Sequence, residues 1–215
     1  MRLIAIDGPA GSGKSTVARA VATALGLAYL DTGAMYRAVA FAALRRGIDP
    51  EDTEVVARLA EQVDLTVAGT VMVDGVDATI EIRGPEVSRA VSTVAANPRV
   101  RRELKRRQQE WAVAHGGGVI EGRDIGSVVF PDADVKVYLT ATDTERAGRR
   151  SKEVLAMDYD QVAADIARRD HIDSTRSASP LTVAPGAVVV DTTGRSVDEV
   201  VRDVLDLAAG GKGQV

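Results

Sequence analysis

The chain has 215 residues, of which 45% are hydrophobic and 27% charged, and this composition is typical of a globular protein with one sizeable core. The absence of cysteine excludes disulfides and thiolate metal sites and fits a reducing cytoplasm. A net charge of −4 argues against a general nucleic-acid-binding protein, and no apolar stretch reaches the length of a membrane span.

The first feature along the chain is a strand, a glycine-rich loop and a helix. Residues 2–7 form an apolar run of strand length, and residues 16–25 are apolar at helical spacing. Between them, residues 8–15 read GPAGSGKS and match the pattern G-x-x-x-x-G-K-S/T at every fixed position. We call residues 8–15 the phosphate loop. Because the chain enters a strand at once, we expect no signal peptide.

The phosphate loop predicts a site for a nucleoside triphosphate. Glycines let the backbone curl so that successive N–H groups point inward, and the N-terminus of the following helix favours negative charge. We expect Lys14 to reach the β- and γ-phosphates and the Ser15 hydroxyl to hold Mg²⁺. The flanking strand and helix disfavour the alternative, a glycine-rich turn with a surface lysine. The residues expected to bind ATP are Gly8, Pro9, Ala10, Gly11, Ser12, Gly13, Lys14, Ser15 and Thr16.

Strands and helices alternate along much of the remaining chain. Short apolar runs typical of buried parallel strands lie at residues 27–30, 119–120, 135–139 and 187–190. Helical patterns lie at residues 35–46, 51–61, 85–107 with a break at Asn97-Pro98, and 99–114. Capping boxes at residues 142–145 and 196–199 open two more helices, and the tail at 210–215 should fray. The alternation predicts an α/β fold with a P-loop NTPase-type parallel sheet flanked by helices.

One region, at residues 63–83, breaks this alternation. Short alternating runs at 65–67, 71–73 and 80–82 are separated by turn signals at Gly69 and Asp74-Gly75. This pattern predicts a small antiparallel meander inserted as a subdomain. We expect a single domain with a core at about residues 1–62, 112–145 and 185–209, an insert at about 63–111 and a helical lid at about 146–184.

The phosphate loop alone does not separate a switch, a motor and a small-molecule kinase. The chain lacks the N-K-x-D pattern of a GTPase and is short for a motor. A kinase needs a second pocket for its acceptor, and arginine, which far outnumbers lysine here, suits bidentate binding of phosphate. Residues 31–37 and 121–126 follow predicted strands directly, at the sheet edge where ligands bind in α/β folds. Further candidates, any of which could instead lie on a solvated face, are Ser92, Arg101, Arg146, Arg149, Arg150, Arg168, Arg169, Asp173 and Arg176.

Five motifs give the chain a resemblance to bacterial cytidylate kinases. They are GPAGSGKST, LDTGAMYR, NPRVR-x-x-L-x-x-RQ, EGRDIGSVVFPDA and RRD…STR-x-x-x-PL, and they cover nearly the whole chain in the expected order. The resemblance implies transfer of the γ-phosphoryl group of ATP to CMP or dCMP, with Mg²⁺. It also implies that the partners are these small nucleotides, with no nucleic acid and no membrane, and that the protein is a cytoplasmic monomer.

The resemblance assigns roles to individual residues. The positions that match those holding the acceptor phosphate are Arg37, Arg123 and Arg176. The positions that match those reading cytosine are Ser92, Arg101 and Asp124. Residues expected near the sugar or elsewhere on the bound CMP are Thr32, Tyr36, Arg169 and Asp173. The residues expected to stabilise charge on the transferring phosphoryl group are Lys14, Arg123 and the lid residues Arg149 and Arg150.

The chemistry of cytosine agrees with this assignment. Its N4 amino group is a donor that the Asp124 carboxylate can accept, and its N3 and O2 acceptors suit Arg101 and Ser92. Uracil presents O4, an acceptor, instead and would leave the carboxylate unpaired. An unpaired buried group costs about 1–3 kcal/mol, which corresponds to a roughly tenfold to hundredfold preference for cytosine over uracil.

Ser15 departs from the Gly-Lys-Gly ending common in the family, and it strengthens the expected Mg²⁺ contact. Residues 171–174 carry fewer arginines than the family pattern, so the ATP contacts of this segment are not assigned. Two alternatives stay open: a P-loop kinase for another acceptor, such as UMP or shikimate, and a non-catalytic ATP sensor.

Overall fold

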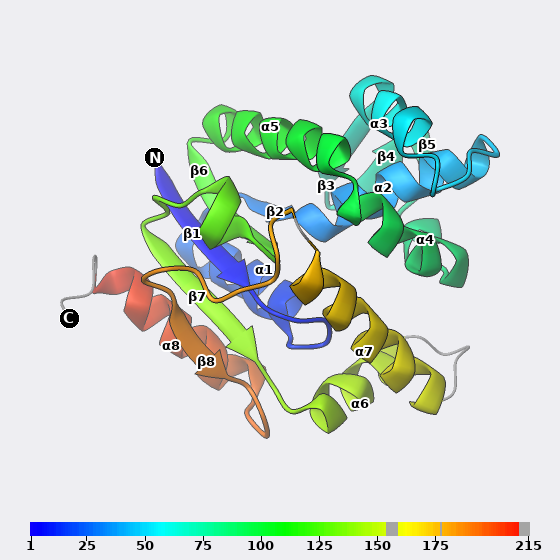
Figure 1. Ribbon diagram of the computed structural model, residues 1–215. Coiled ribbons are helices and arrows are strands. Elements are labelled where there is room, and N and C mark those ends of the chain that lie inside the picture. The colour runs from blue at the N-terminus through cyan, green and yellow to red at the C-terminus, as the bar shows by residue number, and fades with distance from the viewer. Residues whose placement is uncertain (154–158, 177, 211–215) are drawn as a thin grey trace. The chain divides into compact units, whose positions relative to one another are not determined.

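The computed structural model describes residues 1–153, 159–176 and 178–210, and the chain divides into two compact units (Figure 1). The first unit comprises residues 1–29 and 112–215, and the second comprises residues 30–111. Residues 211–215 of the tail that was expected to fray lie outside the described part. Within the described part, no helix is both long and apolar enough to cross a membrane.

A five-stranded sheet forms the centre of the first unit, in the order β2-β6-β1-β7-β8. Its strands are β1 (Arg2–Asp7), β2 (Tyr29–Asp31, at the boundary with the second unit), β6 (Gly117–Gly122), β7 (Val135–Thr140) and β8 (Val188–Asp191). Its helices are α1 (Lys14–Leu25), the π-helix η2 (Ile125–Val129), α6 (Asp143–Glu153), α7 (Tyr159–Thr175) and α8 (Val197–Ala209). Strand β1 pairs in parallel with β6 and β7, and β7 pairs in parallel with β8, so the predicted α/β fold class is confirmed.

Helices α1 and α8 pack together on one face of this sheet (Figure 1). Alternate residues of β1, Ile4 and Ile6, point into their shared core, and Val21 of α1 and Val204 of α8 meet them there with no exposed surface. Successive strand residues face opposite sides, so Asp7 points away from this core. The carboxyl end of β1 is thereby fixed, and the phosphate loop starts from it.

The two predicted capping boxes have different outcomes. At α8 the Ser196 side chain accepts from the Glu199 N–H and the Glu199 carboxylate accepts from the Ser196 N–H, so this box is confirmed. At α6 the Thr142 hydroxyl accepts from the Glu145 N–H, as predicted. The second bond of the predicted box, from the Thr142 N–H to the Glu145 carboxylate, is wrong. The Thr142 N–H donates to the Thr193 hydroxyl instead, and the Glu145 carboxylate pairs with Arg149.

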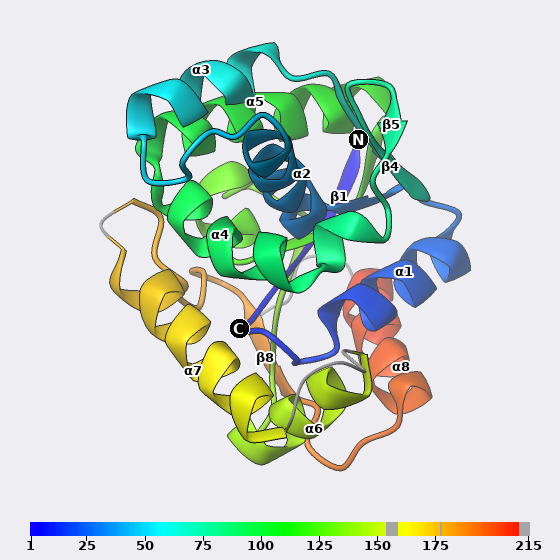
Figure 2. The same ribbon diagram turned by 90° about the vertical axis from the view of Figure 1, so that its right-hand side faces the viewer.

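The second unit is built around α2 (Figure 2). Its helices are α2 (Thr32–Arg45), α3 (Thr53–Gln62), α4 (Pro85–Ala96) and α5 (Pro98–Ala114), with a short 3₁₀ helix η1 (Glu81–Arg83). Asp31 caps α2 by accepting from the Ala34 N–H at 2.9 Å. The predicted break at Asn97-Pro98 is confirmed, because α4 ends and α5 begins there, with the Asn97 side chain accepting from the Arg99 N–H.

The predicted meander is confirmed in part. Strands β3 (Leu65–Ala68), β4 (Thr70–Val73) and β5 (Val76–Asp77) form an antiparallel sheet in that order. The expected third strand at residues 80–82 is wrong, since η1 occupies that position. The turn at Asp74-Gly75, with φ of 50° and 75°, pairs Val73 with Val76 and so places the third strand earlier.

Candidate active site

The phosphate loop joins β1 to α1 with a conformation that requires its glycines. Gly8, Gly11 and Gly13 have φ of 147°, 76° and 86°. A Cβ on Gly8 would lie 2.0 Å from the Leu139 carbonyl oxygen. Two loop carbonyls are bound from outside the loop: the Gly8 oxygen accepts from Arg123 Nη1 at 3.0 Å and the Ser12 oxygen accepts from the Thr192 hydroxyl at 3.3 Å. These contacts fix two carbonyls of the loop that leads to the N-terminus of α1.

Lys14 lies buried against this loop. Its Nζ donates to the Pro9 carbonyl at 2.6 Å and to the Ser12 hydroxyl at 3.4 Å, and both acceptors are neutral. Burial and the nearby Arg123 guanidinium lower the pKa of Lys14 to about 7. An anion bound in the loop would favour the charged form again, as expected for a phosphate-binding lysine.

Ser15 contacts a carboxylate that the sequence analysis left without a role. Its hydroxyl donates to Glu121 Oε2 at 3.0 Å, and the Tyr29 hydroxyl donates to the other oxygen of Glu121. Glu121 is only 3% exposed, and it lies at the end of β6, beside β1. An acidic residue at the end of an apolar strand was the available signal. A hydroxyl and a carboxylate are oxygen ligands of the kind that Mg²⁺ prefers.

Metal ligands are otherwise few. The described ranges contain no group of three or more His, Cys, Asp and Glu side chains placed to hold an ion. Mg²⁺ in phosphoryl-transfer sites is bound by one or two protein groups together with phosphate oxygens and water, so Ser15 and Glu121 fit that type of site.

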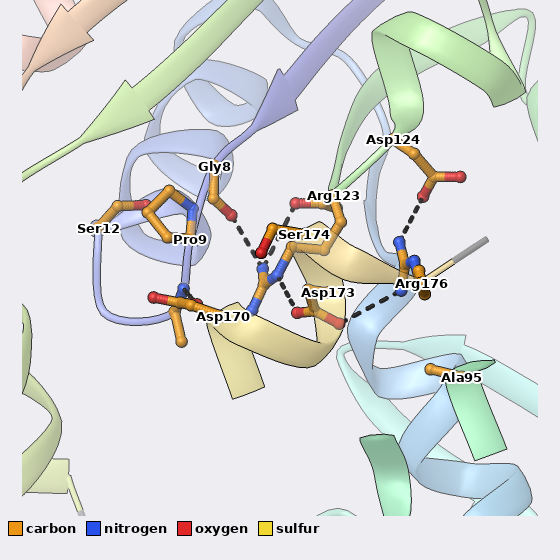
Figure 3. A network of polar contacts seen from close by, with 12 residues as sticks. Gly8, Pro9, Ser12, Ala95, Arg123, Asp124, Asp170, Asp173, Ser174 and Arg176 are labelled. Carbon is orange, nitrogen blue, oxygen red and sulfur yellow. Dashed lines mark hydrogen bonds and ion pairs between the residues drawn. The ribbon is translucent and has the colours of Figure 1, made fainter. Parts of the chain in front are cut away.

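Arg123 connects the phosphate loop to a group of arginines (Figure 3). Besides the Gly8 carbonyl, it contacts Asp173, whose Oδ2 accepts from Arg123 Nε at 2.9 Å. Arg176 donates to the other Asp173 oxygen at 3.2 Å and lies 3.8 Å from Asp124. Burial would raise the pKa of Asp173, but Arg123 and Arg176 hold it below its ordinary value.

The charge in this region is predominantly positive. Arg169, one turn before Asp173 on α7, is partly buried, and burial together with repulsion from Arg123 lowers its pKa to about 10. We call Arg123, Arg169 and Arg176, which surround Asp173, the arginine cluster. Three guanidiniums around one carboxylate form a site that favours an anion.

Asp7 ties the first two residues of η2 to the start of the phosphate loop. Its two carboxylate oxygens accept the main-chain N–H groups of Ile125 at 2.9 Å and Gly126 at 2.8 Å. Burial raises the pKa of Asp7 to about 6, although both amides favour the ionised form. This contact fixes the turn that carries Arg123 and Asp124, and the sequence analysis did not anticipate it.

The arginines of α6 separate into different environments. Arg149 donates to the Thr192 hydroxyl and carbonyl, each at 2.8 Å, and a Cβ on Gly13 would lie 3.6 Å from its Nη1. Arg149 therefore lies next to the phosphate loop. Arg150 lies close enough to Arg169 to disfavour its charge. Arg146, by contrast, is buried in ion pairs with Asp143 and Asp170.

The remaining predicted acceptor residues lie in the second unit. Arg37 is buried on α2, and its Nη1 donates to the Ile82 carbonyl and the Ser88 hydroxyl, both at 3.0 Å. Arg101 of α5 donates to the Ala95 carbonyl at 3.1 Å, and its guanidinium carbon lies 5.4 Å from the centre of the Tyr36 ring. The other two predicted residues of this unit, both buried, are Thr32 of α2 and Ser92 of α4. The structure thus assembles the predicted residues as two groups, one within each unit.

Comparisons with known proteins identify the family. A family model described as cytidylate kinase matches residues 4–209. A protein of Mycolicibacterium paratuberculosis named cytidylate kinase is 50% identical over 214 residues, covering 95% of this chain and 94% of its own length. One of Desulfitobacterium hafniense with the same name is 48% identical over 212 residues, covering 95% of this chain and 91% of its own.

A solved structure agrees with the fold. The crystal structure of TT1252 from Thermus thermophilus has a TM-score of 0.51 and 21% identity, and the match covers 99% of this chain and 98% of that one. At this identity the likeness concerns the fold alone. The family model and the two sequence relatives span nearly the whole chain, and on that ground the protein belongs to the cytidylate kinase family.

Proposed function

We propose that the protein is a cytidylate kinase that transfers the γ-phosphoryl group of ATP to CMP or dCMP, giving ADP and CDP or dCDP. The observation that carries the proposal is Arg123, whose guanidinium contacts both the Gly8 carbonyl and Asp173. One side chain thus joins the predicted triphosphate site to the arginine cluster. A donor and an acceptor phosphate would both lie near a single cation, as positioning for phosphoryl transfer requires.

In this proposal the phosphate loop and Lys14 bind the triphosphate of ATP. The Ser15 hydroxyl and the Glu121 carboxylate would hold Mg²⁺, with Tyr29 orienting Glu121. When bound, Mg²⁺ neutralises charge on the β- and γ-phosphate oxygens. Because the pKa of Lys14 is about 7 in the free protein, part of the lysine is neutral, and it would take up a proton when the phosphates bind.

The roles on the acceptor side are assigned through the family resemblance. Arg37, Arg123 and Arg176 bind the phosphate of CMP, and Arg169 and Asp173 contact its sugar region. In this assignment the base is read by Ser92, Arg101 and Asp124. The acceptor phosphate is already anionic near pH 7, so its oxygen attacks the γ-phosphorus without a general base.

Charge that develops during transfer is stabilised by the lid arginines. Arg149 is supported in this role by its position beside Gly13. Arg149 contacts Thr192, which is uncharged, and Glu145, a partly exposed residue of the same helix. The guanidinium can therefore turn toward a phosphate without breaking a buried ion pair. Arg150 shares the role. The proposal also includes a cytoplasmic, monomeric enzyme.

A coupled assay of ADP formation tests this function, with ATP as donor and CMP, dCMP, UMP, AMP and shikimate as acceptors. We expect rapid turnover with CMP or dCMP and at least about tenfold lower kcat/KM with UMP. Equal use of CMP, UMP and AMP would refute the cytosine assignment, and turnover of shikimate alone would point to the other kinase class. ATP binding without any diphosphate product would indicate a sensor.

A further inference from the structure

The peptide of Ala10, inside the phosphate loop, is held on both sides by side chains from α6 and α7. Its N–H donates to Asp170 Oδ1 at 3.2 Å, and its carbonyl accepts from Arg146 Nη1 at 2.9 Å. The same nitrogen of Arg146 donates to the second oxygen of Asp170. Figure 3 shows Asp170 of α7 directly beside the loop that carries Pro9 and Ser12. The Arg146 guanidinium, the Asp170 carboxylate and the main chain of Ala10 therefore close a ring, which we call the Ala10 clamp.

Packing leaves the clamp little freedom. Ala10 is buried in a small apolar cluster with Ala147 of α6 and with Val162 and Ile166 of α7. The next residue, Gly11, is so close to α6 that a Cβ would lie 2.6 Å from the main-chain oxygen of Arg146. The loop and the two helices thus form one packed body at this point, and a shift of Ala10 would disturb both helices.

The single positive charge of the clamp, on Arg146, pairs with two carboxylates, those of Asp170 and Asp143. The side chain of Arg146 is 8% exposed, and Asp143 pairs with its second terminal nitrogen at 2.6 Å. Without Arg146, the Asp170 carboxylate would lose its ion-pair partner beside the predicted phosphate positions, would keep only the longer-range attraction of Lys14 and Arg123, and would repel a triphosphate more strongly. Arg146 thus allows a carboxylate to act as the hydrogen-bond acceptor of the Ala10 N–H inside a loop that is predicted to bind phosphate.

We propose that Arg146 and Asp170 are positioning residues of the phosphate loop, which hold the Ala10 peptide so that its N–H stays on Asp170 while the amides from Gly11 onward bind phosphate. The inference rests on the proposed function only in that the loop binds ATP, and not on the identity of the acceptor. It narrows the set of ATP-binding amides expected from the motif. It also gives Arg146 a role different from that of the neighbouring Arg149 and Arg150.

Amide signals of the ¹⁵N-labelled full chain test the proposal. In the free protein the Ala10 N–H should exchange slowly with deuterium. Addition of Mg²⁺ and AMP-PNP, a non-hydrolysable ATP analogue, should shift the signals of Gly11 and Gly13 and leave Ala10 protected and little shifted. If AMP-PNP shifts Ala10 as much as Gly13, phosphate displaces Asp170 and the proposal is wrong.

Two substitutions separate the hydrogen bond from a general effect on folding. Asp170→Ala removes the acceptor, whereas Asp170→Asn keeps an oxygen for the Ala10 N–H. We expect Asp170→Ala to weaken AMP-PNP binding about tenfold or more and to expose Ala10 to exchange, and Asp170→Asn to recover most of both. The matched control is Asp165→Asn, because Asp165 lies on the same helix, forms an ion pair with the half-exposed Arg168 and acts on Arg169 only through a longer-range attraction. Equal losses for Asp170→Ala and either Asn variant would overturn the proposal.

The clamp and the proposed function fail in different ways. A wild-type protein that binds AMP-PNP yet never phosphorylates CMP would refute the function, and the amide measurements would still decide on the clamp. If circular dichroism shows that Asp170→Ala does not fold, the measurement on the wild-type protein decides alone.

Discussion

Two cations beside the phosphate loop, the buried Lys14 and the partly buried Arg123, differ in how their pKa values respond to their surroundings. Burial and the nearby Arg123 lower the pKa of Lys14 to about 7, since its hydrogen-bond acceptors at Pro9 and Ser12 are neutral. Burial also disfavours charge on Arg123, but Asp173 outweighs it and the pKa of Arg123 rises. A lysine held by neutral oxygens can lose its proton, whereas a guanidinium paired with a carboxylate stays charged.

The two anion sites therefore acquire their positive charge in different ways. The arginine cluster carries its positive charge before any ligand arrives, because Asp173 stabilises it. The charge of the phosphate loop depends on the protonation of Lys14, and therefore on the ligand. Five experiments test this difference between the two cations and the groups around them.

Lys14→Ala should have the largest effect. Removing the Lys14 ammonium should lower kcat about 100- to 1000-fold while CMP affinity stays nearly unchanged, because Lys14 acts on the donor phosphates. Steady-state kinetics and CMP titration would show this. The control is Lys136→Ala, whose ammonium contacts the Pro185 carbonyl in an exposed position. Parallel losses of kcat and CMP affinity would contradict the role of Lys14.

Arg123→Lys tests whether the role of Arg123 requires the several donor nitrogens of a guanidinium or only a positive charge. A single ammonium cannot contact the Gly8 carbonyl and Asp173 in the same geometry, and burial would lower its pKa. We expect kcat/KM for CMP to fall about 100-fold. Arg195→Lys, at an exposed pair with Asp203, should behave like wild type. A fall of less than about threefold would show that charge alone suffices at position 123.

Asp7 adds a buried anion to the comparison. Its pKa is about 6 in the folded protein, against 3.8 as the ordinary value, so it contributes stability at low pH that is lost as pH rises through 6. Between pH 4.5 and pH 7 the wild type should lose about 2 kcal/mol of unfolding free energy relative to Asp7→Asn. Urea unfolding of both proteins across this range measures the difference. A constant difference would contradict the raised pKa.

Asp124→Asn should change selectivity more than catalysis. The amide can donate to uracil O4, so the preference for CMP over UMP should narrow about tenfold. The ratio of the two kcat/KM values measures it. An unchanged ratio would mean that the base is read elsewhere.

Proton uptake should give the smallest signal. Above pH 7 much of Lys14 is neutral in the free protein, and a bound triphosphate should restore its proton. Calorimetric titration of AMP-PNP at pH 8 in buffers of different ionisation enthalpy should show uptake of about half a proton or more. Lys14→Arg, which stays charged, should show none. Equal uptake by both proteins would assign the proton to another group.

The same comparison explains what the sequence could and could not predict. The phosphate loop is contiguous, and its glycines, Lys14 and Ser15 follow from local backbone rules, so its conformation was predictable. Arg123 was a candidate from its place after a predicted strand, and Arg169 and Arg176 were candidates from an arginine-rich segment, but only the family resemblance assigned their roles. Their grouping around Asp173 depends on how β6 meets α7, which no local pattern encodes.

The contacts that sequence reasoning missed join distant parts of the chain. Glu121 with Ser15, Asp7 with Gly126 and Asp170 with Ala10 each span more than a hundred positions, as the separations of 106, 119 and 160 show. Each pairs a charged side chain with a polar group, and such pairs leave no periodic signal. The misplaced third strand of the meander has a local cause, because the tight turn at Asp74-Gly75 was recognised but the strand after it is very short.

The carboxylate of Asp7 sets a condition on engineering this protein. Its oxygens both accept from main-chain amides, those of Ile125 and Gly126, so the segment before the phosphate loop and the first turn of η2 form a matched pair of parts. A loop grafted from another kinase without that turn would leave the aspartate facing foreign backbone. Chimaeras should therefore exchange residues 7–15 and 123–126 together.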